Sequence, residues 1–372
     1  MELQAKSYLI IITALAIIII LFTYLNIQQE KPITRVDIEE LGTCRSLVYN
    51  GEDRIDLLFL ASEEDTKRFS DTILNTPPYD ENKDYFNVFF IPPSDYTPTC
   101  EDYKGIAILC STKENLEAAR RCPNDYIIIV KDYPTNIRSS AFSNVVSINK
   151  NHENSVIIHE FGHAFGNLAE EYVPANLPRG AKNCVSSCDK FNAPTDSCDL
   201  ECSKTNFFRS IRAGVMRTLT TSDYGQYNIH LLKKLLEKNS PSEPAITGNQ
   251  ISEYAGCENE QVVIVEGTQS TDGSISLDKP TKILQGCSPD NSGAGVETIT
   301  TASGQESYSV TTMFTDVQSG ETLTGSLESP ANIVFSTAFT SNKDEIILTD
   351  TETGAILSQT TLAQAGATAC IV

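Results

Sequence analysis

The sequence predicts a mixed α/β domain over residues 51–240, with an apolar segment before it and a β-rich module after it. Short apolar runs alternate with helical patterns inside residues 51–240, as expected of an α/β layer. Residues 8–25 carry no charge, and Thr, Ser and Gly dominate from about residue 250. With 372 residues, 40% of them hydrophobic, the chain can bury more than one core.

The apolar segment at residues 8–25 (YLIIITALAIIIILFTYL) predicts an N-terminal transmembrane helix. As a helix it would measure about 27 Å, close to the thickness of the hydrocarbon core of a bilayer. A cleaved signal peptide is the alternative, but no small-x-small cleavage site follows the segment. We therefore expect residues 1–30 to form a membrane anchor with a short flank, and residues 31–50 to form a stalk.

The 11 cysteines indicate the compartment. This number is high for a reducing compartment and reasonable for one in which disulfides form. Together with the predicted anchor, the cysteines place the body of the protein outside the cytoplasm, at the cell surface. The net charge of -21 argues against nucleic acid as a partner, because phosphates require a basic surface.

Apolar runs and helical periodicity predict the elements of residues 51–240 in chain order. We expect strands at residues 55–60, 87–91, 105–110, 126–130 and 144–148, the last of them at the edge of the sheet. We expect helices at residues 62–74, 113–121, 153–165 and 229–237. Prolines at positions 241 and 244 then predict a linker. Short strand-like runs in residues 250–372 favour a Thr/Ser-rich β-sandwich-like module.

Two histidines four residues apart form the most informative motif of the chain, in residues 159–172 (HEFGHAFGNLAEEY). On a helix, His159 and His163 share one face and can bind one zinc ion together. Glu160 follows the first histidine and can take a proton from water that such an ion activates. The chain has only four histidines, so a chance origin of this spacing is disfavoured.

A catalytic zinc site needs a third protein ligand. On a straight helix, Glu170 would lie about 16 Å along the axis from His159. The helix therefore has to end first, and Gly166 predicts the place because glycine tolerates a left-handed turn. Beyond it, Glu170 or Glu171 can return toward the metal. Neighbouring residues of an extended segment point to opposite sides, so we expect only one of the two to bind.

The motif HEFGHAFGNLAEEY resembles the IgA peptidase family of zinc metallopeptidases, within the wider metzincin group. That family typically has Asp-Glu-Tyr where this chain has Glu170, Glu171 and Tyr172, so residue 170 departs from its pattern. The run GVMR at residues 214–217 resembles the methionine turn beneath the zinc of that group, with Met216 as its thioether. The similarity extends to IDLLFL, FNVFFI, YIIIV and the helix after Met216, and covers roughly residues 50–240.

This resemblance implies a zincin- or metzincin-like catalytic domain at residues 51–240. It implies a zinc-dependent endopeptidase that hydrolyses protein or peptide substrates outside the cytoplasm, with Glu160 as the general base. Both Glu170 and Glu171 stay candidates for the third ligand. The position of Glu170 resembles that of the ligand aspartate in metzincins whose turn is one residue shorter. Glu171 matches the glutamate of the Asp-Glu-Tyr pattern in the IgA peptidase family. For Met216 the alternative is an ordinary core methionine.

A cysteine cluster follows the motif, at positions Cys184, Cys188, Cys198 and Cys202. Its spacing suits either two disulfides or a second, structural zinc site, and an oxidising compartment favours disulfides. Two other functions are open on the sequence. One is an inactive adhesion or binding module that keeps the fold. The other is a thermolysin-like arrangement in which a distal glutamate, such as Glu237, is the third ligand.

Overall fold

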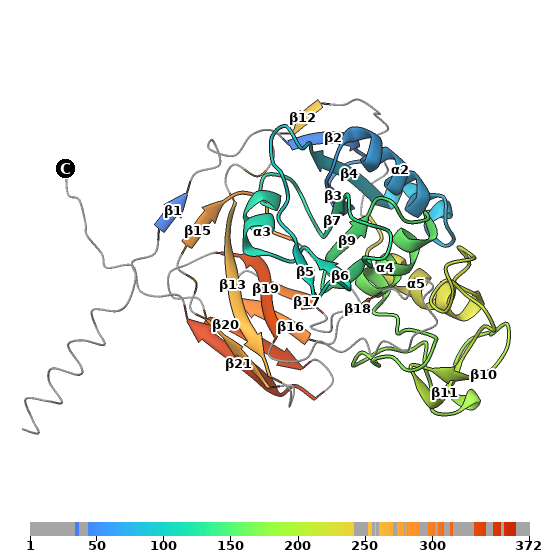
Figure 1. The fold of residues 1–372 in the computed structure, drawn as a ribbon. Helices are drawn as coiled ribbons and strands as arrows, with labels where there is room; N and C mark the ends of the chain where they lie inside the picture. The colour runs from blue at the N-terminus through green and yellow to red at the C-terminus, as the bar shows by residue number, and fades with distance from the viewer. Residues whose placement is uncertain are drawn as a thin grey trace, which may run out of the picture.

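The computed structural model describes residues 34–36 and 44–241 and, with gaps, residues 252–361. An α/β part surrounds an eight-stranded central sheet, and a C-terminal β part consists of two further sheets (Figure 1). The candidate site lies in the α/β part, on helix α4 (Ser155–Gly166) and the loop that follows it.

The central sheet has the strand order β12-β2-β4-β3-β7-β9-β8-β18. The strands β4, β3, β7 and β9 in its middle run parallel to one another. Both faces of these strands are covered, so their sequences read as nearly continuous apolar runs. The bounds are β2 (Cys44–Val48), β3 (Ile55–Leu60), β4 (Phe86–Ile91), β7 (Tyr126–Lys131), β8 (Ser140–Phe142), β9 (Val145–Asn149), β12 (Ser252–Tyr254) and β18 (Met313–Phe314).

Alternate residues of β3 point into two different cores. Leu57 and Phe59 belong to a core that also contains residues of α2 (Glu63–Leu74), α4 and α5 (Gln226–Lys238). Leu58 and Leu60 belong to a second core, shared with α3 (Lys113–Ala119) and with strands of the C-terminal part. The central sheet therefore carries α4 on one face and rests on the C-terminal part with the other.

The C-terminal part is a sandwich of two sheets joined by a common apolar core that includes Val265, Phe335, Ile299 and Leu348. One sheet contains β1 (Thr34–Val36), β15 (Lys282–Gln285), β13 (Gln261–Gln269), β14 (Ile275–Leu277) and β19 (Ala331–Ala338). The other contains β17 (Gly304–Tyr308), β16 (Glu297–Thr301), β20 (Glu345–Asp350) and β21 (Ile356–Thr361).

Short elements complete the described chain. Two hairpins stand apart from the large sheets, β5 (Glu101–Tyr103) with β6 (Ala107–Leu109), and β10 (Asp199–Cys202) with β11 (Lys204–Arg209). Single 3-10 turns occur at η2 (Tyr79–Glu81), η3 (Lys83–Tyr85) and η4 (Cys188–Lys190).

Several sequence expectations change in detail. The expected stalk at residues 31–50 contains β1, which joins the C-terminal part, and β2, which joins the central sheet. The run at residues 105–110 forms hairpin strand β6 instead of a strand of the main sheet. Strand β9 is not at the edge, because β8 and β18 lie beyond it. Strands β12 and β18 come from beyond residue 250, so long-range pairing crosses the expected domain boundary in both directions.

The predicted fold class is corrected in one further respect. Among the residues that the structure describes, no helix is both long and apolar enough to cross a membrane. The segment at residues 8–25, where we expected the transmembrane helix, lies outside the described residues. The described fold is a mixed α/β protein with several sheets and the four helices α2 to α5.

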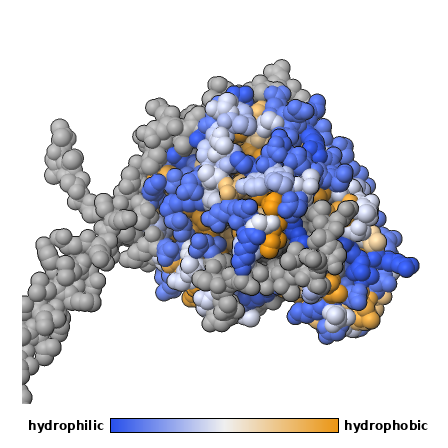
Figure 2. Space-filling model, viewed as in Figure 1, coloured by the Kyte–Doolittle hydropathy of each residue, from blue (hydrophilic) through white to orange (hydrophobic). Residues whose placement is uncertain are grey.

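Ten of the cysteines form disulfides, which fits an extracellular or secreted protein. The pairs are Cys44–Cys122, Cys100–Cys110, Cys184–Cys202, Cys188–Cys198 and Cys257–Cys287. Figure 2 shows a face that is largely hydrophilic with scattered hydrophobic patches, as expected for a chain with a net charge of -21.

Candidate metal centre

Helix α4 presents two histidines toward the same point. His159 and His163 are one turn apart on it, and their Nε2 atoms lie 2.9 Å from each other. Both side chains are buried, with exposed fractions of 2% and 4%. The apolar face of the helix, including Phe161 and Phe165, packs into the core against the sheet. Core packing therefore decides in which direction the histidines point.

The helix ends at Gly166, and the chain reverses at the next residue. Asn167 adopts the left-handed conformation with a φ of 46°, which asparagine tolerates better than most residues. The expectation that Gly166 itself makes the turn is therefore wrong. A Cβ at Gly166 would lie 2.7 Å from Leu232 Cδ2, so any larger residue there would require that side chain to shift.

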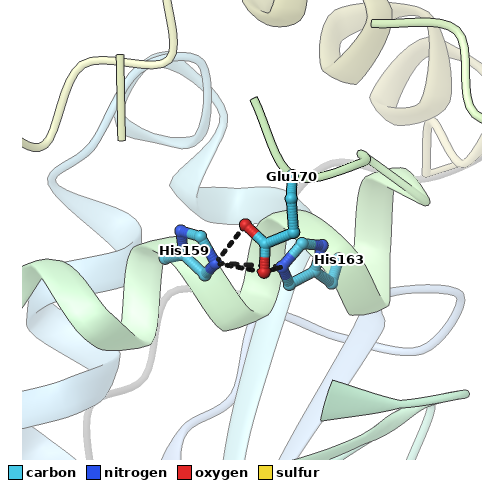
Figure 3. Close-up of side chains that lie close together, drawn as sticks. All are labelled: His159, His163 and Glu170. Carbon is cyan, nitrogen blue, oxygen red and sulfur yellow. Dashed lines mark hydrogen bonds and ion pairs between the residues drawn. The ribbon is translucent and has the colours of Figure 1, made fainter. Parts of the chain in front are cut away.

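The reversed chain brings a carboxylate back to the histidines. Glu170 reaches down from the loop above α4 and points between the two imidazoles (Figure 3). Its Oε1 lies 3.2 Å from His163 Nε2, and its Oε2 lies 3.2 Å from His159 Nε2. Within the described ranges, these three side chains are the one group of three or more His, Cys, Asp or Glu residues whose geometry can hold a metal ion. His159, His163 and Glu170 are called the metal group from here on.

The hydrogen bonds of the two rings leave lone pairs facing this point. His159 donates its Nδ1–H to the Val215 carbonyl oxygen at 2.8 Å, and His163 donates its Nδ1–H to the Leu168 carbonyl oxygen at 2.5 Å. A neutral imidazole with a proton on Nδ1 carries its lone pair on Nε2. These carbonyls thus fix the tautomer that a metal requires, which is the usual arrangement of ligating histidines.

Two lone pairs and a carboxylate this close repel one another unless a proton or a metal ion lies between them. Ligand atoms at the usual distance from a tetrahedral ion would lie about 3.3 Å apart. The observed spacings of 2.9 Å and 3.2 Å are close to that value. The residues present therefore fit a small divalent metal ion.

The electrostatics of the pocket favour positive charge in the same way. Burial by itself lowers the pKa of His159, but the nearby Glu170 and Glu160 carboxylates and the Val215 carbonyl raise it to about 9. Burial raises the pKa of Glu170, yet His159 and His163 outweigh this effect and lower it to about 2. The Glu170 carboxylate therefore stabilises a positive charge at this point, whether a proton on His159 or a metal ion.

Glu160 lies on α4 directly after the first histidine and is fully buried, with an exposed fraction of 0%. Its carboxylate is close enough to His159 to raise the pKa of that ring. Glu160 is therefore a buried carboxylate on the same helix as the two histidines.

Glu171 turns away from the metal group. Its Oε1 accepts hydrogen bonds from Asn228 Nδ2 at 2.8 Å and from Asn183 Nδ2 at 3.2 Å. Its backbone N–H donates to the Met216 carbonyl oxygen at 2.9 Å. Burial raises the pKa of its carboxyl group to about 7 despite these donors. Of the two candidate glutamates, the structure brings only Glu170 to the histidines.

Met216 lies underneath the helix in a fully buried position. A Cβ on Gly162 would be 2.9 Å from Met216 Sδ and 2.9 Å from Tyr224 Cε1. The Tyr224 hydroxyl donates to the Ile158 carbonyl oxygen. Met216 and Tyr224 therefore form a floor in direct contact with the helix turn between the two histidines, and Gly162 makes the close approach possible.

The cysteine cluster forms two disulfides, Cys184–Cys202 and Cys188–Cys198, and not a second zinc site. The distal candidate Glu237 is exposed on α5 and does not join the metal group. Sequence reasoning missed Asn183 and Ser203, whose side chains contact the backbone of residues 169 and 170. Their one sequence signal is that they flank two of the cysteines.

The sequence matches no protein-family model, and a search of curated proteins returned no match. What the chain does is therefore inferred from the site itself.

Proposed function

We propose that this protein is a zinc-dependent endopeptidase that acts on proteins or peptides outside the cytoplasm. One observation carries the proposal, the buried convergence of His159, His163 and Glu170 with Glu160 on the same helix. The disulfides support the location, because they persist in oxidising compartments.

The donor set favours zinc over other common ions. Two imidazoles and one carboxylate are a typical protein ligand set of catalytic zinc, with the fourth position left for water or substrate. Calcium and magnesium prefer sites made of oxygen ligands. A transition metal of similar size can occupy the same ligands, so cobalt serves below as a spectroscopic substitute.

The residues divide the work of hydrolysis among them. Zinc held by His159, His163 and Glu170 would polarise a carbonyl group and lower the pKa of a water molecule to about 7. Glu160 takes the proton from the water as it attacks the peptide carbonyl, and returns that proton to the leaving amine. The Val215 and Leu168 carbonyls keep Nδ1 of each histidine protonated, so that both Nε2 atoms stay available as ligands.

The test uses the purified full-length chain, its Glu160→Gln variant and a matched control, Glu237→Gln. The parent should contain one zinc per chain and cleave an unfolded protein, and a chelator should abolish cleavage. Glu160→Gln should keep zinc and lose activity by about 10²–10⁴-fold, the usual effect of removing a general base. Glu237→Gln changes an exposed glutamate on α5 and should behave as the parent.

Two results would contradict the proposal. Near-normal cleavage by Glu160→Gln would rule out the role of this residue. A parent that binds zinc but cleaves none of a panel of unfolded proteins would instead favour the inactive binding module.

A further inference from the structure

We propose that the Cys184–Cys202 disulfide and its two neighbours, Asn183 and Ser203, form a clamp that positions Glu170 and so sets the metal affinity of the site. The inference rests on the metal-binding function proposed above and assigns a role to the loop that the cysteines close. Asn183 and Ser203 are positioning residues in this scheme, because they act on the metal through Glu170.

Asn183 holds the residues that flank the ligand Glu170. Its Oδ1 accepts a hydrogen bond from the Ala169 N–H at 2.7 Å, and its Nδ2 donates to the Ala169 carbonyl oxygen at 2.9 Å. The same Nδ2 lies 3.2 Å from Glu171 Oε1. Asn183 is fully buried, so its amide cannot exchange these partners for water. It therefore binds residues 169 and 171, on both sides of Glu170.

Ser203 holds the ligand residue itself. Its hydroxyl lies 2.8 Å from the Glu170 carbonyl oxygen and 3.1 Å from the Asn176 carbonyl oxygen. The Ser203 carbonyl oxygen in turn accepts from the Ala175 N–H at 3.0 Å. Ser203 is buried and has a positive φ of 54°. Ser203 therefore links the backbone of Glu170 to the backbone of residues 175 and 176, which precede the first cysteine of the loop.

The disulfide brings these two side chains to the same place. Asn183 precedes Cys184 and Ser203 follows Cys202, so the covalent bond joins the residues next to both contacts. Cys184 and Cys202 are buried and pack with Ala169 in a small apolar cluster. Without the bond, the two ends of the loop would be held to the ligand segment only by hydrogen bonds and this cluster.

Glu171, the residue after the ligand, also has backbone contacts that do not involve the disulfide. The Glu171 N–H donates to the Met216 carbonyl oxygen, and Arg217 Nη1 donates to the Glu171 carbonyl oxygen at 2.7 Å. Removing the disulfide should therefore leave Glu171 held by Met216 and Arg217 while Glu170 gains freedom. Sites held more loosely than about 0.5 Å lose function even when all ligands are present.

The loop contains its own control. Cys188–Cys198 closes a smaller loop inside the same region, and both of its cysteines are exposed. The sequence separations of the two bonds are 18 and 10 residues, so their loss releases similar chain entropy in the unfolded state. Only Cys184–Cys202 lies next to the contacts on Glu170. Any difference in metal affinity between the two removals reports position and not general stability.

The experiment compares the full-length parent with Cys184→Ser/Cys202→Ser, Cys188→Ser/Cys198→Ser, Asn183→Ala and Ser203→Ala. Zinc affinity is measured by competition with a chelator, and the cobalt-substituted proteins give absorption spectra that report the ligand set. Circular dichroism establishes that each variant is folded. We expect zinc binding about 10–100-fold weaker, with an altered cobalt spectrum, in every variant except Cys188→Ser/Cys198→Ser.

The outcomes separate the two proposals. If Cys184→Ser/Cys202→Ser and Ser203→Ala keep the affinity and the cobalt spectrum of the parent, the clamp is overturned and the metal site stands. If Cys184→Ser/Cys202→Ser does not fold, Ser203→Ala decides, because it removes one hydroxyl and keeps both disulfides. A parent that binds no zinc would overturn the proposed function, and the clamp with it.

Discussion

Helix α4 and the loop after it both supply side chains to the metal group, but different interactions hold them. On the helix, His159 and His163 keep their spacing through the backbone hydrogen bonds of a single element. In the loop, Glu170 depends on contacts from Asn183 and Ser203, which are 13 and 33 residues away in the sequence. The first arrangement is local, and the second requires a folded cysteine loop.

This difference indicates which changes should abolish metal binding and which should only weaken it. A helix packed on a sheet moves as a unit, so the two imidazoles stay together as long as the core is intact. The ligand segment instead follows the state of its clamp. Changes on the helix should therefore remove metal binding outright, whereas changes around the loop should weaken it by degrees.

The largest effect is expected for His163→Ala, which removes a helix ligand. The remaining histidine and glutamate cannot complete the three-ligand set, so the variant should lose stoichiometric zinc on dialysis. Metal analysis of the dialysed protein measures this. His152→Ala is the control, because His152 hydrogen-bonds to Ser139 and the Thr135 carbonyl and lies outside the metal group. Full zinc in His163→Ala would disprove the ligand assignment.

A graded effect should separate the two adjacent glutamates. Glu170→Ala should weaken zinc binding by far more than the 10–100-fold typical of a residue that only supports a ligand. Glu171→Ala should fall within that lower range, because Glu171 contacts Asn183 and Asn228 and not the histidines. Chelator competition on both variants gives the comparison. A larger loss for Glu171→Ala would reverse the assignment.

The smallest effect is expected where Met216 and Tyr224 contact helix α4, and it should change the free energy of unfolding. A Cβ at Gly162 would press on Met216 and on Tyr224, whose hydroxyl is tied to the Ile158 carbonyl. Overpacking of this kind costs about 1–3 kcal/mol, against a gain of about 0.5–1 kcal/mol from helix propensity. We expect Gly162→Ala to lower the free energy of unfolding in urea.

The reverse change on the same helix calibrates that measurement. Ala164 is only partly buried, so Ala164→Gly reports mainly the propensity difference at this helix. If Gly162→Ala proves more stable than the parent, Met216 and Tyr224 pack less tightly against Gly162 than the structure indicates. Their contacts would then contribute less to the stability of this helix than proposed.

The amino-acid sequence by itself determined the local part of this protein. The four-residue spacing of His159 and His163 follows from the period of a helix, and the apolar runs of β3, β4 and β7 follow from burial on both faces. Both patterns depend on residues a few positions apart, so they can be read without knowing the fold. The choice between Glu170 and Glu171 stayed open, because adjacent residues have the same reach.

Only the tertiary structure decided that choice. Which glutamate meets the histidines depends on the left-handed turn at Asn167 and on the contacts of Asn183, Ser203 and Met216 with the ligand segment. The same holds for the strands that cross between the two parts of the chain, since β1, β12 and β18 pair with strands far away in sequence. Such contacts form between residues that no local period relates, and they exist only once the chain has folded.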